Sequence, residues 1–275
     1  MKQLFTVKDT MNLSEFFQGG ISRIQGDLYD PRSDQHVLDF FTRPADYKRK
    51  YAYGYGGFVD RGHEYSGDPT IPDMQESYTI TTGRDEPLAP ELQFIYGSLF
   101  QRLCTIGREA VALILQNEFL AASGLSIDDF EYNMQINYFY PYAASDLEAG
   151  RQFRVGEHTD LGLFTIMPFG VVYDFEALVG DGWIAPATGD PRPVIFPGTL
   201  AQFLSKGNIP ALSHRVRLSD NTSVRLSCPF AIIPKPTAQL LPLGIEEEGI
   251  TGKQFIDGLL SSHLSNDIKY WVFRK

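Results

Sequence analysis

Residues 131–140, EYNMQINYFY, predict a β-strand, because the stretch is short and rich in aromatic residues. Similar stretches occur toward the C-terminus, and most are bounded by Gly, Pro, Asp or Asn. They cover residues 161–167, 194–196, 224–233 and 270–273. Many short strands separated by such turns are typical of a β-sandwich or jelly roll. The sequence after residue 130 is therefore expected to form mostly β structure.

Helical patterns flank these strands on both sides. Between residues 91 and 119, apolar residues recur every seven positions, which predicts a long amphipathic helix with one buried stripe. The spacing lasts for one helix only, which favours packing against the core over a coiled coil. Near the C-terminus, Thr251 and Gln254 form a capping-box pattern that predicts a final helix.

The sequence contains no internal repeat, low-complexity tract or long polar linker, so we expect a single domain over residues 1–275. The predicted fold class is mostly β with flanking helices. A mainly helical N-terminal part is expected over about 1–125, a jelly-roll core over about 130–235, and a C-terminal helix and tail over about 249–275.

Composition and charge narrow the functional classes. The chain has 43% hydrophobic and 21% charged residues, which is typical of an ordinary globular protein. Its formal net charge of -10 argues against a nucleic-acid partner, because such proteins need a basic patch to neutralise phosphates. A local basic pocket for a small acidic ligand is still compatible with this charge.

The cysteines and the apolar runs indicate the compartment. Cys104 and Cys228 are the only cysteines, and both lie in apolar patterns that predict buried thiols rather than a disulfide. No apolar run approaches the roughly 20 residues of a membrane span. The first nine residues contain no apolar segment like that of a signal peptide. We therefore expect a cytoplasmic protein without a membrane partner; the oligomeric state cannot be read from the sequence.

Two histidines and one aspartate form a candidate metal site. His158 and Asp160 are two residues apart, so on a strand both side chains would point to one face. His214 lies 54 residues after Asp160, a separation that would let a jelly roll return to a neighbouring strand. A His-x-Asp pair alone more often marks a hydrogen-bonded histidine. Two imidazoles and one carboxylate suit Fe(II) with open coordination positions, although zinc accepts the same ligands.

Arg225 and Ser227 supply the context that favours a metal enzyme. They are two residues apart, so they share a strand face, and Arg225 lies eleven residues after His214. A guanidinium binds a carboxylate through two parallel charge-assisted hydrogen bonds, and the serine hydroxyl adds a third donor. The pair could therefore hold a small carboxylate beside the metal.

These segments together resemble the isopenicillin N synthase-like branch of the 2-oxoglutarate/Fe(II)-dependent dioxygenases. The resemblance rests on GEHTDLG at 156–162, SHRV at 213–216 and RLSCPF at 225–230. Weaker similarity extends over residues 54–78, 183–184 and 197–207, and thus over most of the chain from about residue 54 onward.

The resemblance implies a double-stranded β-helix in which His158, Asp160 and His214 hold Fe(II). It also implies that 2-oxoglutarate chelates the iron, that Arg225 and Ser227 bind its distal carboxylate, and that O2 takes the remaining position. The implied activity is oxidation of an unactivated C–H bond of a small molecule, an amino-acid derivative or secondary metabolite, most often by hydroxylation. Catalysis would depend on placing the substrate carbon and keeping the site dry.

The segment before the metal strand leaves one choice open. The family often has Asn-x-Tyr-Pro there, whereas this chain has one additional residue in 137–141, NYFYP. The resemblance places Asn137 and Tyr138 near the co-substrate, but which of Asn137, Tyr138 and Tyr140 faces inward is not decided by the sequence.

Candidates for the substrate pocket come from their positions alone, and each also fits a plain core residue. They are Tyr138, Leu163, Phe175, Phe203 and Phe230.

Two alternative functions remain at this stage. One is an oxidase of the same fold that uses no 2-oxoglutarate, in which Arg225 and Ser227 would hold the carboxylate of the substrate itself. The other is a binding or structural β-sandwich without catalysis, which predicts at least one missing ligand, whereas all three are present.

Overall fold

Antiparallel strands dominate the computed structural model, which describes residues 13–53, 56–66, 70–141, 151–169, 174–186, 192–218, 224–245 and 249–263. The strands are β1 (Ser22–Arg23), β2 (Ala52–Tyr53), β3 (Gly56–Val59), β4 (Gln75–Thr81), β5 (Phe130–Phe139), β6 (Phe153–His158), β7 (Phe164–Met167), β8 (Phe175–Val179), β9 (Gly182–Ile184), β10 (Val194–Pro197), β11 (His214–Arg217), β12 (Arg225–Ser227), β13 (Phe230–Pro234), β14 (Gln239–Leu240) and β15 (Ile250–Thr251). The helices are α2 (Arg32–Phe41), α3 (Ala45–Lys48), α4 (Gln93–Ile95), α5 (Gln101–Ile114), α7 (Thr199–Leu204) and α8 (Gly252–His263). Short 3-10 turns lie at Phe16–Gln18, Arg49–Tyr51, Pro90–Leu92, Ala121–Ser123 and Ile127–Asp129, and a π-helical turn lies at Tyr96–Phe100.

The larger sheet is built around β5. Its strand order is β1-β10-β7-β13-β5-β4-β3-β2, and β12 also pairs with β5, beyond the end of β13. The sequence directs this branching, because Pro229 has no N–H for a ladder and interrupts the predicted strand 224–233 between β12 and β13. The amide of Gln135 bonds the Pro229 carbonyl across the interruption.

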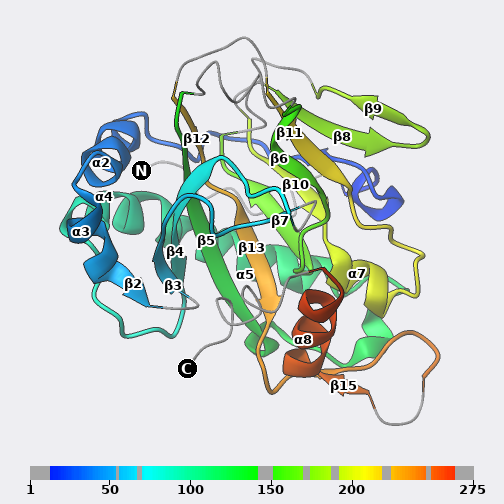
Figure 1. Ribbon diagram of the computed structural model, residues 1–275. Coiled ribbons are helices and arrows are strands. Elements are labelled where there is room, and N and C mark those ends of the chain that lie inside the picture. The colour runs from blue at the N-terminus through cyan, green and yellow to red at the C-terminus, as the bar shows by residue number, and fades with distance from the viewer. Residues whose placement is uncertain are drawn as a thin grey trace.

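A second sheet, in the order β6-β11-β8-β9, faces the first across a narrow interior (Figure 1). Phe139 of the large sheet packs there against Val155 and Val216 of the small sheet. A second interior cluster joins β7 and β10 to β8 in the same way; it consists of Met167, Phe175, Ala177, Val194, Phe196 and Leu212. Two antiparallel sheets packed face to face form the jelly roll that the sequence predicts.

The opposite face of the large sheet carries the main core and is covered by helices. On β5 every second residue from Phe130 to Tyr138 is buried on this side. Helix α5 approaches the sheet closely at Gly107, where a Cβ atom would come within 3.0 Å of Phe230 and 3.1 Å of Tyr132. The alternation of side chains along β5 therefore determines which residues face the helices and which face the interior. Gly107, which has no side chain, lets α5 pack closely on the helical face.

The helical predictions are confirmed in part. The region 91–119 is helical from Pro90 to Ile114, with a π-helical turn inside it. Helix α8 follows its predicted cap, in which the Gln254 amide donates to Thr251 Oγ1 at 3.2 Å. Both cysteines are free thiols, as predicted, but only Cys228 is buried; Cys104 on α5 is half-buried.

The expectation of a mainly helical part up to residue 125 is wrong for β2, β3 and β4, which extend the large sheet. β4 pairs with β5, far along the chain, while β3 pairs with β4 and β2 with β3; local patterns do not report such pairing. The predicted strand 270–273 lies outside the described residues. Within the described ranges, no helix has the length and apolar character needed to cross a membrane.

Candidate metal centre

His158, Asp160 and His214 converge at one end of the small sheet. His158 ends β6, His214 begins β11, and the two residues are direct partners in the antiparallel ladder. Their rings lie 4.2 Å apart between centroids. Asp160 Oδ1 lies 3.7 Å from Nε2 of His158 and 3.8 Å from Nε2 of His214. One ligand atom from each residue falls within 4.8 Å of the others, a spacing that a single metal ion can span.

Backbone and side-chain hydrogen bonds orient all three groups. Nδ1 of His158 lies 2.8 Å from the carbonyl of Gly156, and Nδ1 of His214 lies 3.2 Å from the carbonyl of Leu212. Each ring therefore donates through Nδ1, which leaves the Nε2 lone pair free for a metal. The hydroxyl of Thr165 donates to Asp160 Oδ2 at 2.5 Å, so Oδ1 is the oxygen left to face the imidazoles.

Aromatic packing fixes the buried imidazole. The ring of His214 stacks on Phe175 with centroids 5.2 Å apart and meets the edge of Phe196 at 5.1 Å. Burial, and then the neighbouring His214 ring, lowers the pKa of His158. A neutral imidazole is the form that binds a metal, so this environment favours ligation.

The donor set fits Fe(II). Two imidazole nitrogens and one carboxylate oxygen lie within 4.8 Å of one another, and this donor set is the one that facial triads use to hold Fe(II) with open positions for other ligands. Zinc accepts the same donors, so the triad alone does not choose the metal. The prediction that both residues of the His-x-Asp pair lie on a strand is wrong for Asp160, which lies two residues beyond the end of β6. The turn there carries its carboxylate toward His214.

Arg225 and Ser227 lie together on the interior face of β12, as their spacing predicts. In the ladder, Arg225 is opposite Phe139 and Ser227 is opposite Asn137. The Asn137 amide donates from Nδ2 to Ser227 Oγ at 3.3 Å. The guanidinium carbon of Arg225 lies 4.7 Å from the centre of the Phe139 ring, which supports it from one side.

The guanidinium of Arg225 is buried without a full set of partners. The residue is only 8% exposed, and among the described residues Nε and Nη1 find no hydrogen-bond acceptor. Burial lowers the pKa of this guanidinium to about 10, and the nearby Arg154 acts in the same direction. A buried cation with two unused donors is a costly arrangement that an anion would relieve.

Tyr138 does not lie with Arg225. Because side chains alternate along β5, Asn137 faces the interior and Tyr138 faces the helices. The Tyr138 ring stacks on Phe41 of α2 at 5.3 Å and meets the edge of Tyr140 at 4.8 Å. Of the three residues left open by the sequence, Asn137 is the one beside Ser227, and Tyr138 belongs to the main core.

The substrate-pocket candidates separate into different places. Leu163 and Phe230 are fully buried in the core beneath the helices, on the face away from Arg225. Phe175 packs on His214 and thus supports a candidate ligand.

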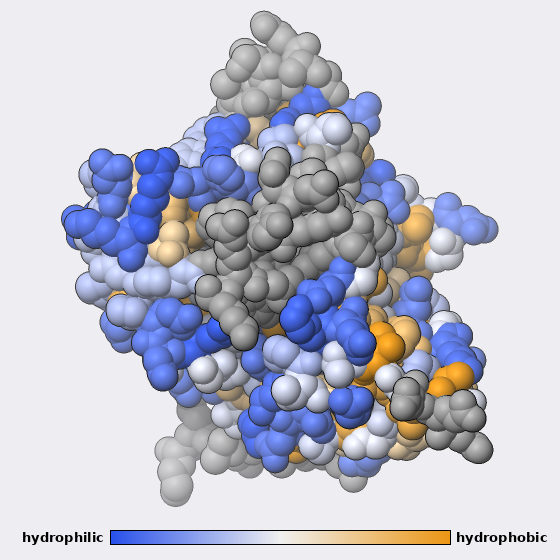
Figure 2. All heavy atoms as spheres, turned by 60° about the horizontal axis from the view of Figure 1, so that its bottom comes forward, coloured by the Kyte–Doolittle hydropathy of each residue, from blue (hydrophilic) through white to orange (hydrophobic). Residues whose placement is uncertain are grey.

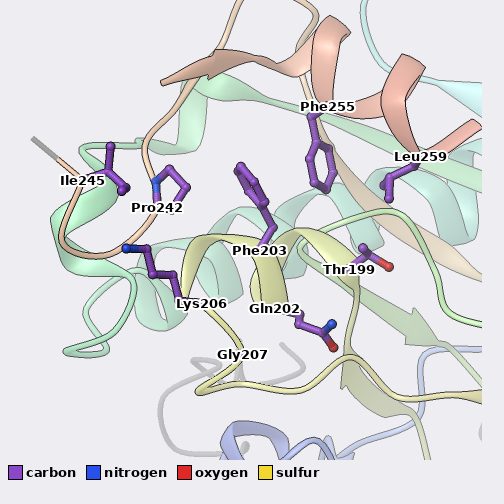
Figure 3. Close-up of a pocket in the computed structure, with 9 residues that line it drawn as sticks. All are labelled: Thr199, Gln202, Phe203, Lys206, Gly207, Pro242, Ile245, Phe255 and Leu259. Atoms are coloured by element: carbon purple, nitrogen blue, oxygen red, sulfur yellow. The ribbon is translucent and has the colours of Figure 1, made fainter. Parts of the chain in front are cut away.

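Phe203 lies elsewhere, in a groove of about 490 Å³ between α7 and α8 (Figure 3). There it faces Phe255 with ring centroids 5.0 Å apart. None of the groove's lining residues is a candidate metal ligand or a partner of Arg225. The face of the molecule turned forward in Figure 2 is mostly hydrophilic, with a small hydrophobic area toward one side.

Sequence reasoning missed a group of polar side chains on the interior face of the large sheet, beside Asn137. It consists of Glu64, Gln75 and Gln135, joined by hydrogen bonds between their side chains. Gln75 and Gln135 share the interior-facing parity of β4 and β5, and that parity was the only available signal. The connecting residue, Glu64, comes from a loop whose position the sequence does not reveal.

Residues 130–234 match the profile of the 2OG-Fe(II) oxygenase superfamily, and this segment contains the three candidate ligands, Arg225 and Ser227. Over this segment the chain is similar to the 2-oxoglutarate/Fe(II)-dependent oxygenases. Enzymes of this family use Fe(II), 2-oxoglutarate and O2. The His158, Asp160 and His214 side chains are suitable ligands for Fe(II), and the unsatisfied donors of Arg225 are suitable for a carboxylate of 2-oxoglutarate.

Known proteins similar to this chain include a curated plant relative and several solved structures. A flavonol synthase/flavanone 3-hydroxylase of Eustoma exaltatum subsp. russellianum is 24% identical over 217 residues, which is 78% of this chain. The aligned part spans 60% of that relative's length.

Among solved structures, a full-length Neurospora crassa protein in complex with alpha-KG has a TM-score of 0.68 at 20% identity, covering 90% of this chain and 87% of the other. A putative oxygenase from Shewanella oneidensis has a TM-score of 0.70 at 18% identity, covering 95% and 96%. At these identities the structures establish the shared fold.

Proposed function

We propose that this chain is an oxygenase that couples the oxidative decarboxylation of 2-oxoglutarate to oxidation of a C–H bond in a small molecule. The proposed outcome of this oxidation is hydroxylation. His158, Asp160 and His214 would hold Fe(II), and Arg225 with Ser227 would bind the distal carboxylate of 2-oxoglutarate. When bound, the iron would activate O2, the oxidant, and the 2-oxo acid would supply two of the four electrons that reduce it, chemistry that no side chain of the protein can provide.

The observation that carries the proposal is the buried, incompletely bonded guanidinium of Arg225. A dicarboxylate meets its needs, because one carboxylate can accept from both Nε and a terminal nitrogen in a planar, bidentate contact. Ser227 lies two residues along the strand on the same face and offers a hydroxyl to the same group. Its oxygen is already positioned by Asn137.

The surrounding residues keep this contact dry. Phe139, Val155 and Val216 pack into a small apolar cluster between the two sheets, and Phe139 also supports Arg225. Exclusion of water strengthens the hydrogen bonds between the guanidinium and a carboxylate, and it protects a reactive centre from side reactions.

The proposed substrate class is a small molecule, such as an amino-acid derivative or a secondary metabolite. The plant relative is named for oxidation of a flavonoid. One protein of similar fold, JOX2, has been solved in complex with 2OG, Fe and JA. These names support small-molecule chemistry.

Succinate formation tests the proposal. Purified protein is incubated with Fe(II), 2-oxoglutarate and O2, and succinate is measured by mass spectrometry. We expect succinate to form, Asp160→Ala to abolish it, and Arg225→Lys to raise the half-saturating 2-oxoglutarate concentration by about 10- to 100-fold. Arg108→Lys is the control, because Arg108 is exposed on α5. If Arg225→Lys behaves like this control, the assigned role of Arg225 is wrong.

A further inference from the structure

A hydrogen-bonded group on the interior face of β4 and β5 has no assigned role in holding iron or 2-oxoglutarate. Glu64 lies on the loop between β3 and β4, and its carboxylate connects two glutamines. Oε2 accepts from Gln75 Nε2 at 3.0 Å, and Oε1 accepts from Gln135 Nε2 at 2.6 Å. Both carboxylate oxygens are thus used by amide donors from neighbouring strands.

This bonding determines which way the glutamines present their amide groups. A carboxylate only accepts hydrogen bonds, so each glutamine must turn its NH2 toward Glu64 and its carbonyl oxygen away. Gln75 shows the consequence: the residue is 6% exposed, and its buried Oε1 has no hydrogen-bond partner in the part of the chain that the structure describes. An unpaired buried acceptor costs about 1–3 kcal/mol.

Asn137 repeats the pattern on the next strand. Its amide nitrogen donates to Ser227, and its buried Oδ1 has no partner within the described ranges. Gln75 is opposite Phe139 in the ladder, so Gln75 and Asn137 are diagonal neighbours on one face. Diagonal neighbours lie about 7–8 Å apart, which one small molecule can bridge.

The group is tied to the metal centre through the backbone. The amide of Asp73 donates to the Glu64 carbonyl at 2.8 Å. The Asp73 carboxylate accepts from the backbone of Gly156, and the Gly156 carbonyl in turn lies 2.8 Å from Nδ1 of His158. Three hydrogen bonds therefore join Glu64 to a candidate iron ligand.

The co-substrate cannot satisfy these oxygens. Ionised 2-oxoglutarate offers two carboxylates and a keto oxygen, all of which are acceptors, and they match the donors of Arg225. An acceptor such as Gln75 Oε1 requires a partner with N–H or O–H. That partner must be a different molecule from the one bound by Arg225.

We propose that Gln75, oriented by Glu64 and Gln135, determines substrate specificity by accepting a hydrogen bond from an N–H or O–H group of the substrate. Asn137 Oδ1 is the second acceptor on the same surface. The substrate is thus a small amide, amine or alcohol whose donor is held against β4 and β5. This inference rests on the proposed function, because it takes Arg225 as the site of the co-substrate.

Thermal unfolding tests the inference without turnover. The protein is loaded with Mn(II) and 2-oxoglutarate and screened against a fixed panel of small amides, amines and alcohols, each beside its N-methyl or O-methyl counterpart. We expect donor-bearing compounds to raise Tm and their fully methylated counterparts to raise it less. If the members of each pair shift Tm equally, or none does, the inference is overturned.

Substitutions separate this inference from the proposed function. Gln75→Leu is expected to weaken binding of the donor compounds by about tenfold or more and to leave the Tm shift caused by 2-oxoglutarate intact. Glu64→Gln, which no longer forces the glutamine orientation, should reduce the preference for donors. Gln239→Leu, an exposed glutamine on β14, is the matched control and should change neither.

The outcomes have distinct meanings. Unchanged donor preference in both Gln75→Leu and Glu64→Gln overturns the inference alone. Absence of any 2-oxoglutarate shift in the unaltered protein overturns the proposed function, and the inference falls with it. If Gln75→Leu does not fold, Glu64→Gln and Gln135→Leu decide the question by the same measurement.

Discussion

The two histidines of the metal centre use the same local device. In each, Nδ1 bonds the carbonyl two residues earlier, Gly156 for His158 and Leu212 for His214. The ring orientation therefore comes from the segment that carries the ligand, and only Asp160 depends on a side chain, Thr165, from another strand. Such supporting bonds fix ligand geometry before a metal arrives.

Thr165→Val tests this support. Removing the hydroxyl frees Asp160 to rotate, so we expect metal affinity to fall by about 10- to 100-fold with little change in secondary structure. Titration with Mn(II) followed by calorimetry measures the effect. Thr237→Val, on an exposed turn, should bind Mn(II) as the unaltered protein does. Equal affinity of the two variants would show that Thr165 does not orient the aspartate.

Much of the site at this scale is predictable from sequence. The sequence groups His158, Asp160 and His214, and separately Arg225 and Ser227, and the structure brings the members of each group together. Glu64 and Gln75 escaped prediction because hydrogen-bonded amides have no fixed spacing in a sequence. Their grouping depends on a loop that folds back over the sheet.

Strand period explains most of the arrangement at the scale of elements. On β5, even-numbered residues from Phe130 to Tyr138 pack under the helices, and odd-numbered residues face the interior. This parity places Asn137 on the interior face beside Ser227 and Tyr138 in the main core, a choice that the motif resemblance left open. The π-helical turn before α5 has no such signal, because it depends on packing rather than on a pattern.

Gly107→Val tests the contact between α5 and the sheet. A side chain at this position meets Phe230, Tyr132 and Ile232 at 3.0–3.2 Å, so we expect the free energy of unfolding to fall by about 1–3 kcal/mol. Gly97→Val is the control, because no atom lies within 4 Å of its Cβ position. Urea denaturation compares the two. A loss of similar size in both variants would contradict the close approach.

The helical layer is fastened to the sheet by a buried ion pair at the scale of the whole molecule. Lys48, at the end of α3, lies 2.5 Å from Glu76 on β4, and both side chains are under 10% exposed. Lys48 also donates to the carbonyl of Phe41 at 3.0 Å. The pair joins α3 to β4 and, through the Phe41 carbonyl, to α2.

Lys48→Met leaves the Glu76 carboxylate buried without its cation, so we expect a loss of about 3–5 kcal/mol in unfolding free energy. The double variant Lys48→Met/Glu76→Leu removes the charge problem and should recover most of this loss. Chemical denaturation of both variants measures it. A double variant as unstable as the single one would indicate that packing, rather than the unpaired charge, determines the effect.

The pairing of strands that lie far apart in the sequence was the least predictable feature of the whole molecule. The ladder pairs His214 with His158 and joins residues 75–81 to 133–139, contacts between segments that lie more than 50 residues apart. Local patterns identify strands but do not report their partners. For this reason the sequence predicts a mainly helical region where the structure has β2, β3 and β4. The long-range pairing nevertheless delivers both histidines and Arg225 to one interior.

Anaerobic titration of the Fe(II)-loaded protein with 2-oxoglutarate tests the central claim most directly. A 2-oxo acid chelated to Fe(II) gives a weak visible charge-transfer band. We predict that the band appears and saturates, and that Arg225→Gln requires a much higher 2-oxoglutarate concentration for the same intensity. Iron binding without any band, or a band unaffected by Arg225→Gln, would contradict the account of this site.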